Sequence, residues 1–185
     1  VEETVLTRPF GKYPYRPDDP ADYHAAAKRL LHMQAASLVR RMQYANLKHP
    51  VVGISGGVDS TLAVIICAEA VKMMGLPADY VTAVTMPCFG TTHRTRSNAE
   101  ILCEELGVIF QEIPIARTVH SHFADIGQDE AALDVTYENC QARVRTLELM
   151  DLANRTGGLV VGTGDLSELA LGWATYNGDH MSMYG

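Results

Sequence analysis

The sequence predicts an α/β fold, with a parallel sheet covered by helices on both faces. Short apolar runs that suit buried strands alternate with longer stretches of helical periodicity. A glycine-rich turn at residues 55–60 joins the first predicted strand to a helix. In such sheets ligands bind beyond the carboxyl ends of the strands. The loops at residues 55–60, 86–92 and 162–168 are therefore expected to surround one crevice.

The individual elements have their own signals. Gly75 and Gly107 are expected to end two helices, because glycine readily takes the left-handed conformation found after a helix. Ser97 and Glu100 have the spacing of a capping box, which predicts that a helix begins there. Strands are predicted at residues 50–54, 80–85, 108–113 and 158–162, and helices at residues 61–74, 97–106, 115–125 and 134–154.

Residues 1–20 are predicted to form an extended arm, or a linker from an upstream domain. They hold four of the eight prolines of the chain and show no sustained periodicity. Asp19 followed by Pro20 is a favourable helix start. Beyond it, apolar residues recur every three or four positions and predict an amphipathic helix: Ala27, Leu31, Ala35, Leu38 and Met42. The globular domain is predicted to span residues 21–185.

The bulk composition narrows the classes of function. With 185 residues, 47% hydrophobic and 20% charged, the chain fits one soluble globular domain. The formal charge of −7 gives no basic surface for nucleic acid, and no apolar run reaches the roughly 18 residues that span a bilayer. The four cysteines are widely spaced, which favours free buried thiols in a reducing compartment. We therefore expect a cytoplasmic protein without a nucleic-acid or membrane partner.

The turn at residues 55–60 has the features of an anion site. A glycine-rich turn before a helix directs several backbone N–H groups, and the positive end of the helix dipole, at one spot. The turn lacks the lysine of a Walker A loop and instead carries Asp59. A carboxylate beside a polyphosphate is repulsive unless a divalent cation lies between them, so the loop predicts a nucleotide with magnesium. The alternative is a tight turn in which Asp59 only favours the helix N-terminus.

A second strand-to-helix turn occupies residues 162–168. Asp165 and Glu168 have the spacing of a helix cap, which is one interpretation. In the other interpretation Thr163 bonds the nucleotide and Glu168 is a second carboxylate near the metal. The spacing alone does not separate the two. The first loop implies a cation that one carboxylate would hold poorly, and this favours a functional role for Glu168.

The helix that follows Asp134 carries a polar line. Its members are three or four residues apart and so share one stripe: Thr136, Asn139, Arg143 and Thr146. A solvated face is the usual meaning of such a line. Recognition of amides and phosphates is the alternative, because the stripe has no acidic partner. Cys140, Val144 and Leu147 are expected to form the buried edge beside it. Elsewhere, His93, Arg94 and Arg96 are expected to coat the rim of the crevice.

Four motifs in this order resemble the glutamine-dependent bacterial NAD synthetases. They are residues 55–60 with the Ser-Gly-Gly-Val-Asp-Ser sequence, residues 83–92, residues 135–145 and the long run of residues 159–184. The six-residue loop is similar to the pyrophosphate loop of N-type ATP pyrophosphatases. The resemblance implies an adenine-nucleotide alpha-hydrolase-like (Rossmann-like) fold. It also implies ATP-dependent amidation of deamido-NAD to NAD through an acyl-adenylate, with release of AMP and pyrophosphate.

The resemblance also assigns roles to residues by motif matching. Asp59 and Glu168 would be the catalytic carboxylates and would hold Mg²⁺. ATP would contact Gly53, Ile54, Ser55, Gly56, Gly57, Val58, Asp59, Ser60, Met86 and Thr163. Deamido-NAD would contact Asn139, Arg143, Glu168, Trp173, Ala174, Thr175 and Tyr176. Ammonia-dependent members carry a lysine at the position of Tyr176, so this position follows the glutamine-dependent pattern.

The chain departs from the family pattern in what it lacks. Family members of this type carry an N-terminal glutaminase domain that supplies ammonia, and they continue beyond the position of Gly185. The chain is therefore expected to be a truncated ATP pyrophosphatase domain, weak or inactive alone, whose partners include the glutaminase domain and a second copy in a homodimer. Other readings keep the fold and change the acceptor: GMP synthetase, asparagine synthetase or a tRNA-modifying relative. A non-catalytic nucleotide-sensing module is a further alternative.

Overall fold

The computed structural model describes residues 7–8, 13, 16–17, 19–89 and 93–185, with the side chains of residues 93–97 outside the description. Four parallel strands in this part of the chain form one sheet in the order β3-β2-β1-β4. Their bounds are His49–Gly53 for β1, Thr82–Thr85 for β2, Ile109–Glu112 for β3 and Gly158–Val161 for β4. Val161, the last residue of β4, also forms an isolated parallel bridge with Tyr184.

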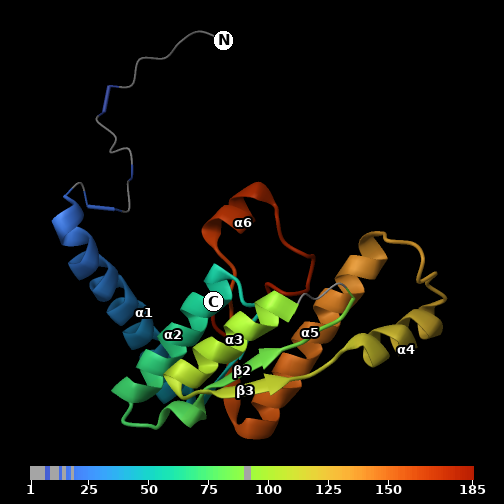
Figure 1. Cartoon of the computed structure of the whole chain (residues 1–185), viewed down its shortest axis with the longest axis horizontal. Helices are drawn as coiled ribbons and strands as arrows, with labels where there is room; N and C mark the ends of the chain where they lie inside the picture. The colour runs from blue at the N-terminus through green and yellow to red at the C-terminus, as the bar shows by residue number, and fades with distance from the viewer. Residues whose placement is uncertain (1–6, 9–12, 14–15, 18, 90–92) are drawn as a thin grey trace.

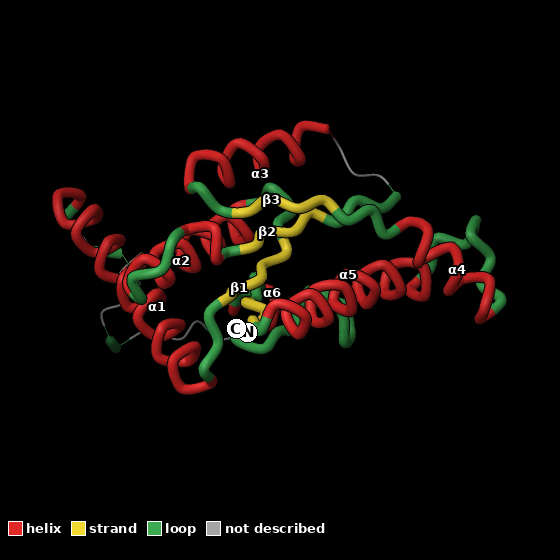
Figure 2. Tube along the Cα trace, turned by 90° about the horizontal axis from the view of Figure 1, so that it is seen from below, coloured by secondary structure: helices red, strands yellow, loops and turns green. Residues whose placement is uncertain are grey.

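Helices cover both faces of this sheet, as Figure 2 shows. On one face α2 and α3 lie against the strands, with α1 packed on α2, and α5 covers the opposite face. Short 3-10 turns lie at Pro20–Asp22 (η1) and Ala78–Tyr80 (η2). The helices are α1 Tyr23–Ala45, α2 Val58–Met73, α3 His93–Leu106, α4 Ala116–Ile126, α5 Val135–Thr156 and α6 Leu166–Leu171. Figure 1 shows α4 and the start of α5 projecting together to one side, with α6 on a projection of its own.

Strands β2 and β4 are buried throughout and β1 is buried at its centre, whereas β3 is only partly buried and ends in Gln111 and Glu112. Val52 and Ala83 face the α2 side, where they join the core formed with α1 and α3. Val51 and Val84 face the α5 side and pack with Leu152. Burial on both faces explains why β1, β2 and β4 appear in the sequence as short, mostly apolar runs rather than as alternating patterns. None of the helices in the described part of the chain combines the length and the apolar character needed to cross a bilayer.

The predicted strands and helices are all present, and two helix starts differ from expectation. The helix predicted at residues 61–74 begins at Val58, which puts Asp59 in its first turn. The capping box at Ser97 is wrong, because α3 already begins at His93. Residues 93–96 contain neither glycine nor proline, so nothing in them stops the helix from extending toward its N-terminus. Asp19 caps the turn η1 as expected, and α1 follows directly.

The cysteines differ in burial. All four are free; Cys67, Cys103 and Cys140 are buried, and Cys88 is half-buried. Burial raises the pKa of Cys103 to about 11, and it raises the pKa of Cys67 further. A thiol reacts through its thiolate, so a raised pKa together with burial slows alkylation near neutral pH.

We therefore expect iodoacetamide to label Cys88 first in the folded protein, with Cys67 the slowest. Peptide mass spectrometry at several reaction times measures the order, and the same reaction in urea is the control, because unfolding removes the differences. Labelling of Cys67 as fast as that of Cys88 in the folded protein would contradict the packing described here.

Candidate active site

Two adjoining cavities lie at the carboxyl ends of β1 and β4. The smaller has a volume of about 370 Å³ and the larger about 660 Å³. The cavities share four lining residues: Ser55, Ser60, Thr163 and Asp179. After β1 the next strands, β2 and β3, are added on one side of β1, whereas β4 is added on the other side. The strand order therefore reverses at the carboxyl end of β1. Ligands of parallel α/β proteins bind at such switch points, and the predicted crevice is confirmed here for the described parts of its loops.

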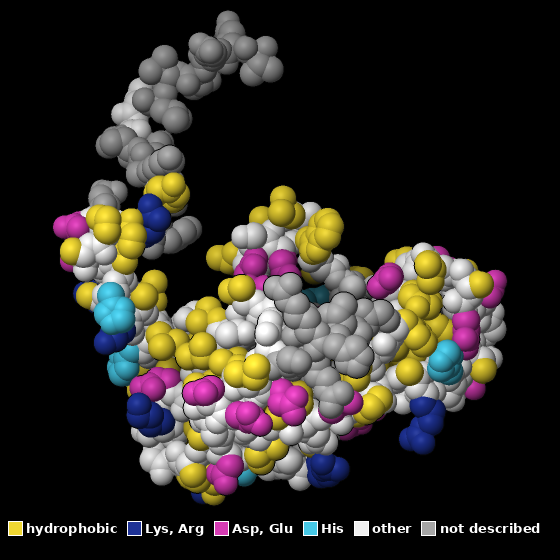
Figure 3. All heavy atoms as spheres, viewed as in Figure 1, with side chains coloured by type: hydrophobic (Ala, Val, Ile, Leu, Met, Phe, Trp, Pro, Cys, Tyr) yellow, Lys and Arg dark blue, Asp and Glu magenta, His cyan; other side chains and the backbone are white. Residues whose placement is uncertain are grey.

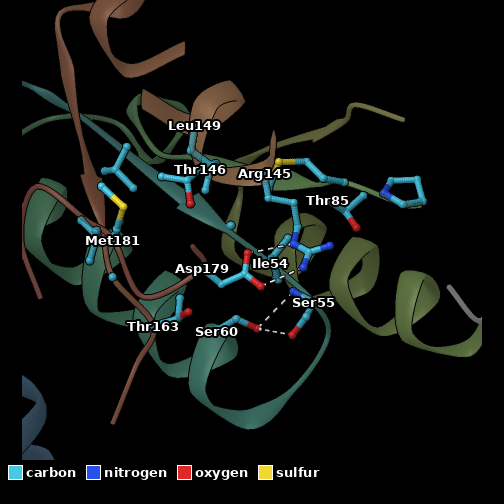
Figure 4. A pocket seen from close by; sticks show the side chains of 16 residues that line it. Ile54, Ser55, Ser60, Thr85, Arg145, Thr146, Leu149, Thr163, Asp179 and Met181 are labelled. Carbon is cyan, nitrogen blue, oxygen red and sulfur yellow. Dashed lines mark hydrogen bonds and ion pairs between the residues drawn. The ribbon is translucent and has the colours of Figure 1, made fainter. Parts of the chain in front are cut away.

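The loop after β1 leaves the first turn of α2 available to a ligand. Gly57 is the N-cap of α2, and no described side chain caps this turn. Gly56 has a φ of 82°, the left-handed region that favours glycine. Figure 4 shows the hydroxyls of Ser55 and Ser60 directed toward one another at 3.2 Å beside the smaller cavity. They accept hydrogen bonds from two amides of the loop, Ser55 N at 3.2 Å and Gly57 N at 3.3 Å.

The loop after β4 begins α6 with a capping box. Asp165 accepts a hydrogen bond from the amide of Glu168 at 2.8 Å, and Glu168 accepts one from the amide of Asp165 at 3.2 Å. The capping interpretation is thus confirmed. Glu168 also lines the larger cavity, as does Asp59 from the first loop. Capping and a place in the cavity are therefore compatible for Glu168.

Helix α5 holds the segment of residues 172–181 against the cavities. Arg145 donates two hydrogen bonds to Asp179, at 2.9 and 2.8 Å. Thr146 donates to the carbonyl of Gly178 at 2.9 Å. Arg143 donates to the carbonyl of Tyr176 at 3.2 Å. This side of α5 binds a neighbouring segment of the chain at three successive points.

The polar stripe of α5 is accordingly more than a solvated face. Thr146 is only 8% exposed because residues of the 172–181 segment cover it. Leu147, expected at the buried edge, is 52% exposed, so that expectation is wrong; Cys140 and Val144 are buried as expected. Asp134 is the N-cap of α5, and its carboxylate accepts hydrogen bonds from the amides of Tyr137 and Thr136. These bonds lower the pKa of Asp134. The bond from the amide of Tyr137 has the largest effect, and the side-chain amide of Gln128, which also donates to this carboxylate, adds to it.

A sequence model of the NAD synthase family matches residues 30–183 of this chain. The chain belongs to the NAD synthase family. The α/β fold with an adenine-nucleotide alpha-hydrolase-like arrangement, expected from the resemblance, is confirmed by solved NAD synthetases. The likeness to the glutamine-dependent type is confirmed as well.

Individual relatives give the extent of the similarity. The chain is 44% identical to a glutamine-dependent NAD(+) synthetase of Mycobacterium leprae and 41% identical to one of Mycobacterium tuberculosis, in each case over 97% of this chain. It spans only 27% of the length of each. A glutamine-dependent NAD+ synthetase of Acinetobacter baumannii, solved in complex with ADP, matches with a TM-score of 0.75 and 30% identity over 82% of this chain and 28% of its own. The ammonia-dependent NAD synthetase of Campylobacter jejuni matches with a TM-score of 0.74 and 27% identity. This match covers 85% of this chain and 65% of the Campylobacter chain.

The structure of this NAD synthase chain brings most of the expected site residues together. Of the residues expected at ATP, the smaller cavity is lined by Gly53, Ile54, Ser55, Ser60, Met86 and Thr163. Of those expected at deamido-NAD or the metal, the larger cavity is lined by Asp59, Asn139, Glu168, Trp173, Ala174, Thr175 and Tyr176. Four others line neither cavity: Gly56, Gly57, Val58 and Arg143. Arg143 is nevertheless bonded to the carbonyl of Tyr176, beside the larger cavity. The side chains of His93, Arg94 and Arg96 lie outside the described residues.

Sequence reasoning missed Arg145, Asp179 and His180. Arg145 and Asp179 line the smaller cavity and Asp179 and His180 the larger one. Burial acts to lower the pKa of Arg145, but the hydrogen bond and the charge of Asp179 outweigh it and raise that pKa. The two partners are 34 residues apart in the chain, so no local spacing indicates their contact. Their only sequence signal is that each falls inside a motif of the family.

The carboxylates that the NAD synthase family pattern implies for Mg²⁺ fit that ion. Asp59 and Glu168 reach one cavity from two different loops. Within the described residues no group of three or more His, Cys, Asp or Glu side chains is placed to hold a metal. Mg²⁺ keeps several waters and is usually bound by one or two carboxylates together with substrate phosphates. Two carboxylates that line one cavity therefore fit a magnesium ion whose remaining ligands are water and substrate phosphates.

The contact between Thr146 and Gly178 is expected to contribute to stability. Replacing Thr146 by valine keeps the shape of the side chain but leaves the buried carbonyl of Gly178 without this donor. We expect a loss of about 1–2 kcal/mol in the free energy of unfolding, measured by urea denaturation. Thr156→Val is the matched control, because the hydroxyl of Thr156 bonds only to carbonyls of its own helix. Equal losses in the two variants would show that the 172–181 segment adds nothing through this bond.

Proposed function

We propose that this chain is the synthetase part of an NAD synthetase, which amidates deamido-NAD to NAD with ATP and ammonia. The observation that carries the proposal is the pair of adjoining cavities that share the 55–60 loop. One cavity suits ATP and the other suits a dinucleotide whose carboxylate must meet the α-phosphate of ATP. Membership of the NAD synthase family and a solved relative that holds ADP support this assignment.

In this proposal the smaller cavity takes ATP. The uncapped first turn of α2 receives the phosphates, since a helix N-terminus without a side-chain cap offers free N–H groups and the positive end of the helix dipole. Thr163 contacts the nucleotide from the opposite loop, and Met86 contacts it from the end of β2. Magnesium, held by Asp59 and Glu168, would neutralise charge on the phosphates and on departing pyrophosphate.

The larger cavity takes deamido-NAD. Asn139 on α5 and the four residues at 173–176 line it, and Trp173 and Tyr176 offer exposed aromatic surfaces to a base. The nicotinate carboxylate attacks the α-phosphate of ATP, which forms the acyl-adenylate and releases pyrophosphate. Ammonia then attacks the activated carbonyl, and AMP leaves. Positioning and electrostatics supply most of such phosphoryl transfer, so the reaction needs no dedicated general base here.

The ammonia is proposed to come from glutamine, hydrolysed by a glutaminase domain of the full-length protein. A homodimer and a cytoplasmic location are part of the same proposal and rest on the family pattern. Light scattering of the purified protein tests the dimer: a monomer at micromolar concentration would contradict it.

An assay of product formation tests the proposed function. The full-length protein is incubated with ATP, Mg²⁺ and ammonium, and AMP, pyrophosphate and NAD are quantified with deamido-NAD as acceptor. Equimolar formation of the three products is the expected result. Xanthosine monophosphate and nicotinic acid mononucleotide serve as competing acceptors; the latter is included because one structural neighbour is an NMN synthetase. Turnover with either in place of deamido-NAD would overturn the proposed acceptor, and ATP binding without any cleavage would favour a sensing module.

A further inference from the structure

The Arg145–Asp179 ion pair lies where the two cavities meet. Both hydrogen bonds are short, at 2.9 and 2.8 Å, and they join the guanidinium fork to both carboxylate oxygens. Asp179 lines both cavities, and Arg145 lines the smaller one. Figure 4 shows the pair reaching across the cavity between α5 and the 172–181 segment, close to Ser55 and Ser60. None of the roles assigned above to ATP, deamido-NAD or Mg²⁺ uses this pair.

The same pair is one of three contacts that attach the 172–181 segment to α5. Residues 172–181 follow α6, and Figure 3 shows hydrophobic side chains gathered on that projection. Trp173 and Tyr176 in this segment are 78% and 73% exposed, so burial of their rings does not hold it in place. Its attachment to α5 is polar. A Cβ at Gly178 would lie 2.7 Å from that of Ala142, so the backbone also approaches α5 as closely as glycine permits.

We infer that Arg145 and Asp179 form a positioning pair with two effects on the proposed substrate sites. The pair holds the 172–181 segment in the conformation that binds deamido-NAD before the substrate arrives. It also neutralises Asp179, whose carboxylate would otherwise face two anionic substrates from the junction of their cavities. This inference rests on the proposed function for the identity of the ligands, but not for the behaviour of the segment without ligand.

Electrostatics gives the two halves of the pair opposite consequences for ATP. Arg145→Gln leaves the Asp179 carboxylate uncompensated beside the phosphates, so ATP should bind more weakly. Asp179→Asn leaves the Arg145 guanidinium unpaired at the same place, so ATP affinity should be kept or increased. Both variants loosen the segment, and both should therefore weaken the binding of deamido-NAD. A pair that served only to stabilise the fold would give the same result for either partner.

The single tryptophan of the chain makes the segment directly observable. Trp173 is the only Trp in the printed sequence and lies in the segment itself, so the tryptophan fluorescence of this chain comes from the segment alone. In the ligand-free chain we expect the fluorescence anisotropy of Trp173 to fall in Arg145→Gln and in Asp179→Asn, because the ring moves more freely. The exchanged double variant, Arg145→Asp with Asp179→Arg, should recover part of that loss. Unchanged anisotropy in both single variants would overturn the inference.

Titrations of the same proteins measure the ligand effects. The dissociation constant for deamido-NAD, read from Trp173 quenching, should rise about three- to tenfold in both single variants, because the pair is partly exposed to solvent. The dissociation constant for ATP with Mg²⁺, measured by calorimetry, should rise in Arg145→Gln and not in Asp179→Asn. The difference between the two variants should become smaller at high salt, because salt screens the charges. A rise in both variants would contradict the electrostatic half of the inference.

Controls separate a failure of the inference from a failure of the proposed function. Asp151→Asn removes an exposed carboxylate of α5 that lines neither cavity, and it should leave the anisotropy and both affinities unchanged. Thermal unfolding of every variant identifies any that misfolds, and Arg145→Lys, which keeps the charge but loses the fork, then replaces Arg145→Gln in the anisotropy measurement. If the unaltered chain binds ATP but not deamido-NAD, the proposed acceptor is wrong. The ligand-free anisotropy and the ATP titrations still decide the role of the pair.

Discussion

Replacing Asp59 by alanine is expected to abolish adenylate formation while leaving the fold intact. Asp59 lies in the first turn of α2 and faces the larger cavity together with Glu168. Without it, the Mg²⁺ proposed to offset the charge of the phosphates would keep one protein ligand instead of two. Removal of a single group that stabilises developing charge costs about a hundredfold to a thousandfold in rate, and loss of a metal ligand should reach at least the upper end of that range.

The measurement is pyrophosphate release by the full-length protein at saturating ATP and deamido-NAD. Asp79→Ala is the matched control, because Asp79 is an exposed carboxylate in η2, which precedes β2 and so lies at the other end of the strands. Both variants should unfold at nearly the temperature of the unaltered protein, since neither carboxylate is buried. Pyrophosphate release by Asp59→Ala at a rate near that of Asp79→Ala would refute the metal assignment.

The fold followed from the sequence because local patterns and topology agree. Strands β1, β2 and β4 are mostly apolar runs buried on both faces, and Gly75 and Gly107 do end helices in the left-handed conformation, as predicted. Parallel strands bring their carboxyl ends to one edge, so the loops after β1 and β4 had to meet. The start of α3 was mispredicted because a Ser-x-x-Glu spacing fits the interior of a helix as well as its first turn.

The site was predictable where it is local and not where it depends on contacts between distant segments. The 55–60 loop and the turn at Thr163 and Glu168 carry their signal within a few residues. The burial of Thr146 and the pairing of Arg145 arise only when the 172–181 segment folds back over α5. Periodicity on α5 alone therefore could not separate a solvated stripe from a face that binds another segment.

Gly56→Val is expected to damage nucleotide binding far more than its effect on stability would suggest. Gly56 has a φ of 82°, and a β-branched residue there is strained by about 1–2 kcal/mol or must shift the loop. A shift would move the uncapped first turn of α2 away from the position in which it is proposed to meet a phosphate. We expect the dissociation constant for ATP, measured by calorimetry with Mg²⁺, to rise by about tenfold or more, since one lost charge-assisted hydrogen bond is enough for such a change.

Gly75→Val supplies the comparison that isolates the loop. Gly75 follows the opposite end of the same helix with a φ of 72°, and a Cβ there meets nothing within 4 Å. The two variants therefore impose similar backbone strain, one before the start of α2 and one after its end. The free energy of unfolding, measured in urea, should fall by a similar amount in both. Only the Gly56 variant should lose ATP affinity. If both bind ATP as the unaltered chain does, the amides of the 55–60 loop do not hold the phosphates, and the smaller cavity must bind the nucleotide by other groups or not at all.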